Sequence, residues 1–381
     1  MPASSLPDSS NQAAVKRSTS SGFETLHIFT GVPDGAVPVG SLLLLNGVLY
    51  STTNFGGNRE SYCSPGDGCG LIYQVASGQE SVTYRFASQA NGLRPYAGLT
   101  NVNGTLYGTT QIGGANNDGT VFAFSPGTSG SESVVYSFGG TPDGQYPRAQ
   151  LTNVSGVLYG TTYQGGASGV GTVFSVTTGG AEQIVYGFKG GSDGAQPLGN
   201  VIDVNGTFYG TTLLGGGPKN KGTVYAINAS GESVLHSFTG KPDGSEPFAG
   251  LIDVNGTLYG TTELGGKYGK GTIFTITSGG QYSVIYNFEG EPDSANPYAG
   301  LTLLNGQLYG VASHGGTNND GTIYTISPSG SEAVLFSFDG TDGAHPYADL
   351  TASDYSSGGT LYGTTNSGGP YSKGTVFQFT P

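Results

Sequence analysis

The chain has 381 residues, a formal net charge of −13 and only 13 Lys and Arg residues. A protein that binds duplex nucleic acid needs a basic face, so this acidic balance argues against that class of function. Glycine reaches 70 residues without a triplet period, which excludes collagen and indicates many turns, and no apolar stretch is long enough to span a membrane.

Residues 1–21 are rich in Ser, Pro, Asn and Ala and lack the apolar core of a signal peptide. We expect a disordered leader here, at the start of a mature chain from which a signal peptide has been removed. The folded domain is expected over residues 22–381.

One motif of about fifty residues recurs seven times in that domain. A period of this length is typical of propellers and solenoids. The repeats begin near residues 39, 96, 148, 198, 248, 298 and 347, each directly after a Pro. The string Leu-Tyr-Gly-Thr-Thr marks them at Leu106–Thr110, Leu158–Thr162, Leu258–Thr262 and Leu361–Thr365, with variants at Leu49–Thr53, Phe208–Thr212 and Leu308–Ser313.

The first repeat carries an insert with the two cysteines of the chain, Cys63 and Cys69. Their spacing does not match the usual zinc sites, and no second cysteine pair is present to complete one. A small local disulfide is favoured over two reduced thiols, and a disulfide implies export to an oxidising compartment.

The second repeat illustrates the predicted strands. They run over Tyr96–Val102, Thr105–Gln111, Gly119–Ser125 and Ser131–Phe138, and Asn103-Gly104 forms a tight hairpin between the first two. In most other repeats the fourth strand also ends in a Phe, before the loop that leads to the next Pro. Four antiparallel strands per unit are typical of a propeller blade.

The two ends of the domain each hold part of one repeat. The chain opens with an isolated fourth strand at Phe23–Phe29 and stops after a third strand at Gly374–Thr380. A solenoid would need capping repeats, whereas joining these two segments completes a seventh blade. The sequence therefore predicts an all-β, seven-bladed propeller of four-stranded antiparallel blades, closed by the N-terminal strand (22–29).

The repeated strings LYGTT, GG and GTVF, at this period, resemble the bacterial GloVer tandem-repeat proteins, also described as a choice-of-anchor tandem-repeat family. The resemblance covers Phe23 to Pro381. It implies an exported protein, often with a C-terminal anchor of varied type, and it implies no common activity. No anchor follows Pro381, so we expect any surface attachment to come from an N-terminal segment that has been removed.

An Asp-Gly pair recurs in the loops between repeats. A cation site in each blade is one interpretation, but calcium loops need several oxygen ligands at short spacing. Turn formation, in which the Asp bonds its own backbone, is therefore favoured. The pairs begin at Asp34, Asp143, Asp193, Asp243 and Asp342, with Asn91 and Asp293 as variants.

Two positions after each opening Pro vary between repeats and are expected at the mouth of the central channel. Aromatic side chains beside amides there suit sugar binding, and ordinary packing of a tapered channel is the alternative. The predicted ligand-binding residues are Arg148, Gln150 and Asn200 on one side, Tyr96, Tyr298, Tyr347 and Asp349 across from them, and Glu263 as a weaker candidate.

His314, His345 and Asp349 are expected to meet where blades six and seven touch. Two histidines and a carboxylate are sufficient for a metal site or for acid–base catalysis. Solvated surface histidines are the favoured alternative. His27 and His236 fall on fourth strands at the outer rim and are assigned no role.

These observations favour an exported, non-catalytic binding propeller that takes an extracellular glycan or protein ligand at the channel mouth. The first alternative is a metal-assisted polysaccharide lyase or hydrolase that uses His314, His345 and Asp349, the one case in which we expect a divalent metal. The second alternative is a structural cell-surface repeat protein. No other cofactor, no nucleic-acid partner and no transmembrane segment is predicted.

Overall fold

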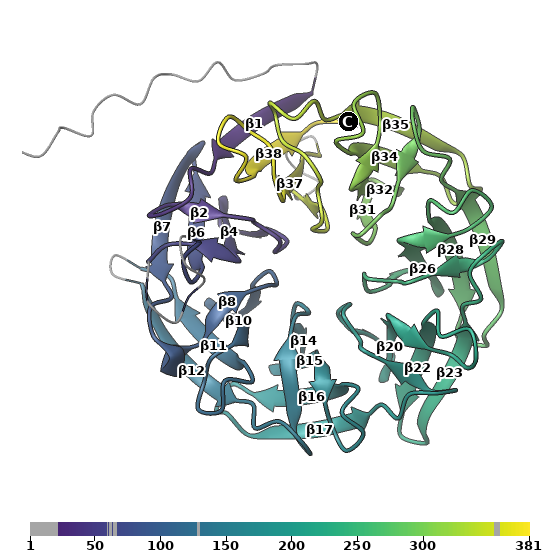
Figure 1. The fold of residues 1–381 in the computed structure, drawn as a ribbon, viewed down its shortest axis with the longest axis horizontal. Coiled ribbons are helices and arrows are strands. Elements are labelled where there is room, and N and C mark those ends of the chain that lie inside the picture. The colour runs from purple at the N-terminus through teal and green to yellow at the C-terminus, as the bar shows by residue number, and fades with distance from the viewer. Residues whose placement is uncertain (1–21, 59, 61–62, 64–66, 128–129, 354–358) are drawn as a thin grey trace, which may run out of the picture.

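The chain forms a ring of seven four-stranded antiparallel sheets in a computed structural model that describes residues 22–58, 60, 63, 67–127, 130–353 and 359–381 (Figure 1). The predicted leader, 1–21, lies outside the described residues. Within the described residues, the one helical element is the short 3-10 turn η1 (Gln89–Asn91), and no helix is long and apolar enough to cross a membrane. The predicted propeller fold is confirmed.

The strands of each blade follow one another from the channel outward. Blade 1 contains β3 (Leu43–Leu45), β4 (Val48–Thr53), β6 (Leu71–Ala76) and β7 (Gln79–Arg85), and blade 2 contains β9 (Thr100–Val102), β10 (Thr105–Ile112), β11 (Thr120–Ser125) and β12 (Ser131–Ser137). Blade 3 contains β14 (Thr152–Val154), β15 (Val157–Gly165), β16 (Thr172–Thr177) and β17 (Glu182–Gly187), and blade 4 contains β19 (Ile202–Val204), β20 (Thr207–Thr212), β22 (Thr223–Asn228) and β23 (Gly231–Ser237). Blade 5 contains β25 (Ile252–Val254), β26 (Thr257–Thr262), β28 (Thr272–Thr277) and β29 (Tyr282–Asn287), and blade 6 contains β31 (Thr302–Leu304), β32 (Gln307–Ala312), β34 (Thr322–Ile326) and β35 (Glu332–Ser337). Blade 7 contains β36 (Thr351–Ala352), β37 (Leu361–Thr365), β38 (Thr375–Phe379) and β1 (Phe23–Ile28).

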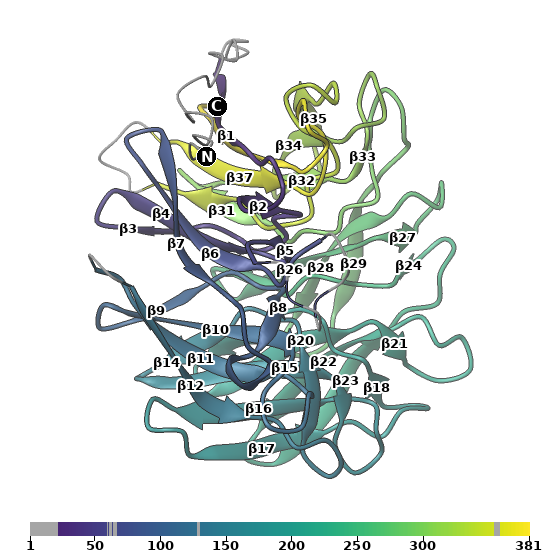
Figure 2. The ribbon, with the colours of Figure 1, turned by 60° about the vertical axis from the view of Figure 1, so that its left-hand side comes forward.

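Short pairings at the start of most blades lie on one face of the ring, opposite the hairpins of β3, β9 and β14 (Figure 2). Blades 1, 4, 5 and 6 have two-stranded ribbons, while β8 (Leu93–Pro95) and β13 (Gly144–Pro147) pair with the ends of β10 and β15. The ribbons are β2 (Gly35–Ala36) with β5 (Phe55–Gly56), β18 (Gly194–Ala195) with β21 (Leu214–Gly215), β24 (Gly244–Ser245) with β27 (Leu264–Gly265), and β30 (Ser294–Ala295) with β33 (His314–Gly315).

The N-terminal strand closes the ring. β1 pairs antiparallel with β38, from Phe23 opposite Phe379 to Ile28 opposite Thr375, and so becomes the outer strand of blade 7 (Figures 1 and 2). The Thr351 hydroxyl also donates to the Leu42 carbonyl across the junction of blades 7 and 1. Closure pairs the edge of β38 that would otherwise be exposed.

Each junction between blades contains an aromatic pair, because the Phe that follows every fourth strand packs edge-on against the third-strand aromatic ring of the next blade. Such pairs contribute about 0.5–1.5 kcal/mol each beyond their buried area. The ring centroids are 5.0–5.4 Å apart in Phe86–Phe122, Phe138–Phe174, Phe188–Tyr225, Phe238–Phe274, Phe288–Tyr324, Phe338–Phe377 and Phe29–Tyr73.

The Leu-Tyr-Gly-Thr-Thr string is explained by these junctions and by packing inside the blade. The first Thr reaches the next blade, as when the Thr211 hydroxyl donates to the Ala249 carbonyl at 2.7 Å. The second Thr bonds the third strand, as in Thr110 with Thr120 at 2.8 Å. The Gly leaves room for the third-strand ring, since a Cβ at Gly108 would lie 2.5 Å from Phe122. The motif is therefore scaffold.

The innermost strand is shorter than predicted. Of the expected strand Tyr96–Val102, only Thr100–Val102 pairs within the blade as β9. The preceding residues bond to the neighbouring blade instead: the Ala97 carbonyl accepts from the Thr52 hydroxyl at 2.9 Å. A Cβ at Gly98 would lie 2.5 Å from the Ser41 carbonyl oxygen, so the seven inner segments converge too closely for a longer ladder.

The predicted disulfide is present. Cys63 and Cys69 are bonded, with their Cα atoms 5.2 Å apart, and both are buried in the cluster that contains Ile72, Phe86 and Leu93. The bond lies at the junction of blades 1 and 2.

Candidate functional site

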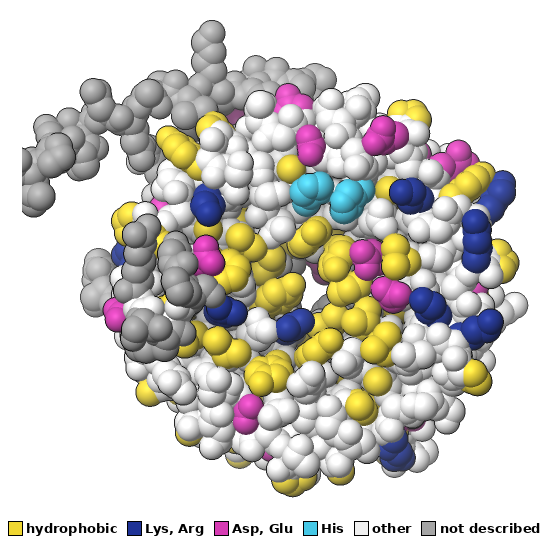
Figure 3. Space-filling view, in the orientation of Figure 1, with side chains coloured by type: hydrophobic (Ala, Val, Ile, Leu, Met, Phe, Trp, Pro, Cys, Tyr) yellow, Lys and Arg dark blue, Asp and Glu magenta, His cyan; other side chains and the backbone are white. Residues whose placement is uncertain are grey.

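A hollow of about 120 Å³ lies at one mouth of the central channel and opens to solvent (Figure 3). It is lined by the segments that follow each blade-opening Pro, which the packing just described holds in place. The lining side chains include Val39, Ser41, Tyr96, Arg148, Gln150, Leu198, Asn200, Phe248, Tyr298, Tyr347 and Asp349.

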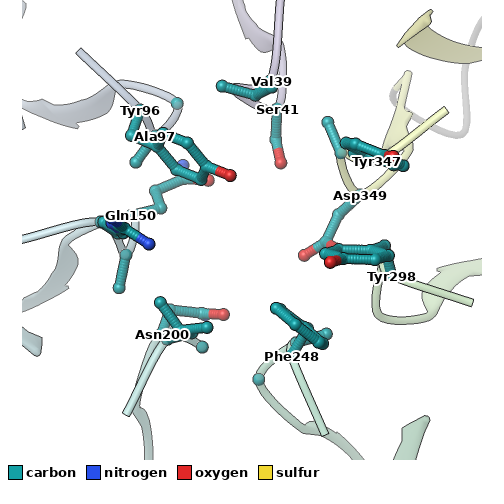
Figure 4. A pocket seen from close by; sticks show the side chains of 18 residues that line it. Val39, Ser41, Tyr96, Ala97, Gln150, Asn200, Phe248, Tyr298, Tyr347 and Asp349 are labelled. Atoms are coloured by element: carbon teal, nitrogen blue, oxygen red, sulfur yellow. The ribbon is translucent and has the colours of Figure 1, made fainter. Parts of the chain in front are cut away.

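One wall of the hollow is an aromatic arc, which we define as Phe248, Tyr298 and Tyr347 from blades 5, 6 and 7 (Figure 4). The Tyr298 ring lies between the other two, with centroid distances of 4.1 Å to Phe248 and 4.5 Å to Tyr347. Burial raises the pKa of the Tyr298 and Tyr347 hydroxyls above the usual value, so both are neutral hydrogen-bonding groups. Because both faces of Tyr298 are covered, the arc offers ring edges and hydroxyls to the channel.

The opposite wall carries Arg148 in a fixed position. Its guanidinium carbon lies 4.6 Å from the centroid of the Tyr163 ring and 5.4 Å from that of Tyr96, within cation–π distance of both. With the Gln111 amide oxygen turned towards it, Arg148 Nη2 also donates a hydrogen bond at 2.7 Å. These contacts hold a positive charge at the rim.

Polar side chains point towards the channel axis from several blades, among them Ser41, Asn200 and Asp349 (Figure 4). The Gly300 backbone N–H donates to Asp349 Oδ1 at 2.7 Å, and burial raises the pKa of this carboxyl. Gln150 Nε2 donates to the Leu99 carbonyl at 3.0 Å. The hollow therefore combines one aromatic wall with converging carboxyl, amide and hydroxyl groups.

Glu263, the weaker sequence candidate, is half-buried and does not line the hollow itself. Burial, with the nearby charge of Glu246, raises the pKa of Glu263 to about 7. Its charge in turn contributes to the raised pKa of Tyr298, which places it in the electrostatic environment of the arc.

The structure brings together two of the three residues of the predicted catalytic set, and two histidine side chains lie side by side on the face with the hollow (Figure 3). The ring centroids of His314 and His345 are 4.8 Å apart, and His345 Nδ1 bonds the Ser313 carbonyl at 2.7 Å. Burial lowers the pKa of His314, and the neighbouring charge of His345 lowers it further. Asp349 does not join them in a group of close ligand atoms among the described residues.

The recurring Asp side chains bond the backbone of their own loops. Asp143 accepts from the Gly139 N–H at 2.7 Å and from the Gly144 N–H at 2.6 Å. Asp193 does the same with the N–H groups of Lys189 and Gly194. This is the turn geometry that the sequence favoured over a cation site in each blade.

The sequence profile of the Gloeobacter/Verrucomicrobia repeat matches residues 9–174 and 152–377, nearly the whole chain. The chain belongs to this repeat family. No curated protein sequence matches it. Membership of the Gloeobacter/Verrucomicrobia repeat family explains the shared scaffold residues and assigns no ligand.

Solved structures with the same fold are distant in sequence. An extracellular domain from a protein described as a hybrid two-component system of B. thetaiotaomicron has a TM-score of 0.58 at 12% identity, covering 93% of this chain and 39% of that one. A puromycin-hydrolyzing peptidase of Mycobacterium tuberculosis has a TM-score of 0.53 at 9% identity, and the match covers 92% of this chain and 54% of the peptidase chain. The periplasmic gluconolactonase of Pseudomonas aeruginosa has a TM-score of 0.51 at 16% identity, and the match covers 87% of this chain and 96% of the gluconolactonase chain. The repeat-family chain spans about half or less of the length of the first two of these proteins. At such low sequence identity, the three likenesses show the fold alone.

Sequence reasoning did not identify Gln111 and Tyr163, which hold Arg148. Both directly follow the second Thr of the Leu-Tyr-Gly-Thr-Thr string, a position that also varies around the ring. The criterion that selected Arg148, variation at a fixed place in the repeat, would have found them if it had been applied to this position as well.

Proposed function

We propose that the chain is an exported, non-catalytic binding module that takes a carbohydrate in the hollow at the channel mouth. The observation that carries this proposal is the composition of the hollow, with the aromatic arc on one wall and Asn200, Asp349 and Ser41 pointing towards the axis. Sites for small polar ligands typically combine apolar walls with a few fixed polar groups.

A polyhydroxylated ligand suits these groups. An amide offers both donors and an acceptor, and each neutral Tyr hydroxyl can donate and accept. Because the faces of Tyr298 are covered by its two neighbours, a sugar ring would contact the edges and hydroxyls of the arc. Arg148 adds a charged donor at the rim, which would favour a sugar that carries a carboxylate or many acceptor oxygens.

Export is supported by the disulfide between Cys63 and Cys69. Such bonds persist in oxidising compartments and are rare in the reducing cytosol of mesophiles. The resemblance to exported tandem-repeat proteins points the same way.

The enzymatic alternative has weaker geometric support. Asp349 bonds the Gly300 N–H, and among the described residues no recorded contact joins it to His314 or His345. The histidine pair alone supplies no oriented carboxylate for acid–base work.

The experiment is a glycan-array screen of the purified chain, followed by calorimetric titration of the best ligand. Replacing Tyr298 by Ala removes the centre of the arc and is expected to weaken binding by about 1–3 kcal/mol. The matched control is Tyr371→Ala, because Tyr371 is 55% exposed and does not line the hollow. Equal affinity of the two variants for the glycan would refute the assignment.

A further inference from the structure

The outer strands of neighbouring blades meet in a recurring seam of three side chains. A Tyr near the end of one fourth strand lies between an Asp in the following loop and a Glu on the fourth strand of the next blade. In one seam the Tyr286 hydroxyl is 3.0 Å from Asp293 Oδ2 and 3.3 Å from Glu332 Oε2. Tyr186, Asp193 and Glu232 repeat this arrangement with the same distances.

Histidine replaces the Tyr in two seams, and the two differ in the third residue. In the seam of blades 4 and 5, His236 Nε2 is 3.1 Å from Asp243 Oδ2, and Tyr282 stands in place of the Glu. The Tyr282 hydroxyl donates to Asp243 at 2.7 Å and its ring stacks on the imidazole. That seam therefore contains a single carboxylate, Asp243, and both His236 and Tyr282 bond to it.

The seam that closes the ring keeps both carboxylates together with the imidazole. His27 lies on β1, Asp34 in the loop after it and Glu80 on β7. One ligand atom from each lies within 4.8 Å of the others, and His27 Nε2 is 3.4 Å from Asp34 Oδ2. Among the described residues, this is the one such group of three His, Cys, Asp or Glu side chains.

The spacing and the partners of these atoms fit a small dication. Ligands about 2.0–2.1 Å from a tetrahedral zinc ion lie about 3.3–3.4 Å apart, which matches the His27–Asp34 distance. His27 Nε2, Asp34 Oδ1 and Glu80 Oε1 are buried and have no hydrogen-bond partner. Buried polar atoms are normally satisfied, so an imidazole nitrogen that lacks a hydrogen bond beside two carboxylates suggests that a ligand is missing from the set.

We propose that His27, Asp34 and Glu80 form a binding site for a divalent transition-metal ion of the zinc type. A neutral imidazole and two carboxylates supply borderline nitrogen and oxygen ligands and two negative charges, and three protein ligands leave one position for water. Calcium and magnesium prefer oxygen ligands throughout, so the imidazole selects against them. The ion would fasten β1, the closing strand, to blade 1.

One neighbouring charge opposes the cation. Arg85 lies on the same strand as Glu80, and its Nε donates to the Pro33 carbonyl beside Asp34 at 3.2 Å. This bond engages the guanidinium with the backbone, while Asp34 Oδ2 accepts hydrogen bonds from the backbone N–H and the hydroxyl of Thr30. The positive charge is expected to weaken metal affinity without removing a ligand.

The test uses the whole chain, stripped with a chelator and titrated calorimetrically with zinc, with melting temperature as a second measurement. His27→Tyr installs the residue that stands at this seam position in blades 1, 2, 3 and 5, so it should fold. Glu80→Gln removes a ligand charge without changing shape. His236→Tyr is the matched control at the other histidine seam.

The proposal predicts one zinc ion per chain for the wild type and for His236→Tyr, and a melting temperature that rises by several degrees when zinc is added. His27→Tyr and Glu80→Gln should each weaken binding at least tenfold and abolish the rise. Absence of zinc binding by the wild type overturns the proposal. So does zinc that His27→Tyr retains at full affinity, because the ion would then lie elsewhere, for example at the His314 and His345 pair.

Discussion

Replacing Glu332 by Gln should stabilise the protein at alkaline pH. Glu332 is half-buried in its seam beside Asp293, and burial followed by that neighbouring charge raises its pKa from the ordinary value of 4.5 to about 7. The folded state therefore holds a proton between these values that the unfolded chain releases. Stability contributed by this group falls as pH rises from 4.5 to 7, and a Gln, which is always neutral, avoids the loss.

The magnitude follows from the size of the shift. About 2.5 pKa units correspond to about 3.4 kcal/mol, and the partial exposure of Glu332 reduces this by solvent screening to about 1–2 kcal/mol. The Gln amide oxygen can accept from one of the two hydroxyls that donate to Glu332, those of Tyr286 and Ser294, and the amide N–H can donate to the oxygen of the other. Urea unfolding of wild type and variant should therefore give a gain of about 1–2 kcal/mol at pH 8 and a difference near zero at pH 4.

The control is Glu289→Gln, since Glu289 is an exposed carboxylate near the same junction. It should change stability by less than about 0.5 kcal/mol at both pH values. A Glu332→Gln variant that is destabilised at pH 8, or that shows the same pH dependence as the wild type, would refute the reasoning.

Three further predictions concern the scaffold. Deleting residues 1–30 removes β1, so it should lower the free energy of unfolding by several kcal/mol and cause aggregation. Deleting residues 1–21 should leave the calorimetric melting temperature unchanged. Equal melting temperatures for the two truncated chains would contradict closure of the ring by β1. Phe138→Ala should cost about 3–5 kcal/mol in urea unfolding, because the ring is fully buried at a blade junction. Alkylation and mass spectrometry of native protein should find Cys63 and Cys69 bonded, and replacing both by Ser should cost at most about 2 kcal/mol.

The fold could be predicted in detail because its signals are local and repeated. The Tyr, Gly and two Thr of each Leu-Tyr-Gly-Thr-Thr string pack the same way in most blades, so the period alone revealed the blades and their closure. The inner strand was predicted too long, because the crowding of Gly98 against Ser41 is a contact between blades that one repeat does not reveal.

The candidate site was only partly accessible to this reasoning. Variation after each Pro pointed to the residues that line the hollow, but no sequence pattern indicated that Tyr298 would have both faces covered. The seam carboxylates were missed, although a Glu near the start of the fourth strand recurs in five repeats. Its significance depends on an Asp from another blade, and that proximity is a property of the closed ring.

The most direct test of the binding proposal is the stoichiometry of ligand binding. An asymmetric hollow formed from unequal blades should bind one glycan per chain, and Asn200→Ala should weaken that binding by about 1–3 kcal/mol with the melting temperature preserved. A calorimetric titration that gives one site, with an affinity that falls when Asn200 is replaced by Ala, is the result expected. Several equivalent sites per chain, unaffected by Asn200→Ala, would place binding on the shared blade surfaces and contradict the proposal.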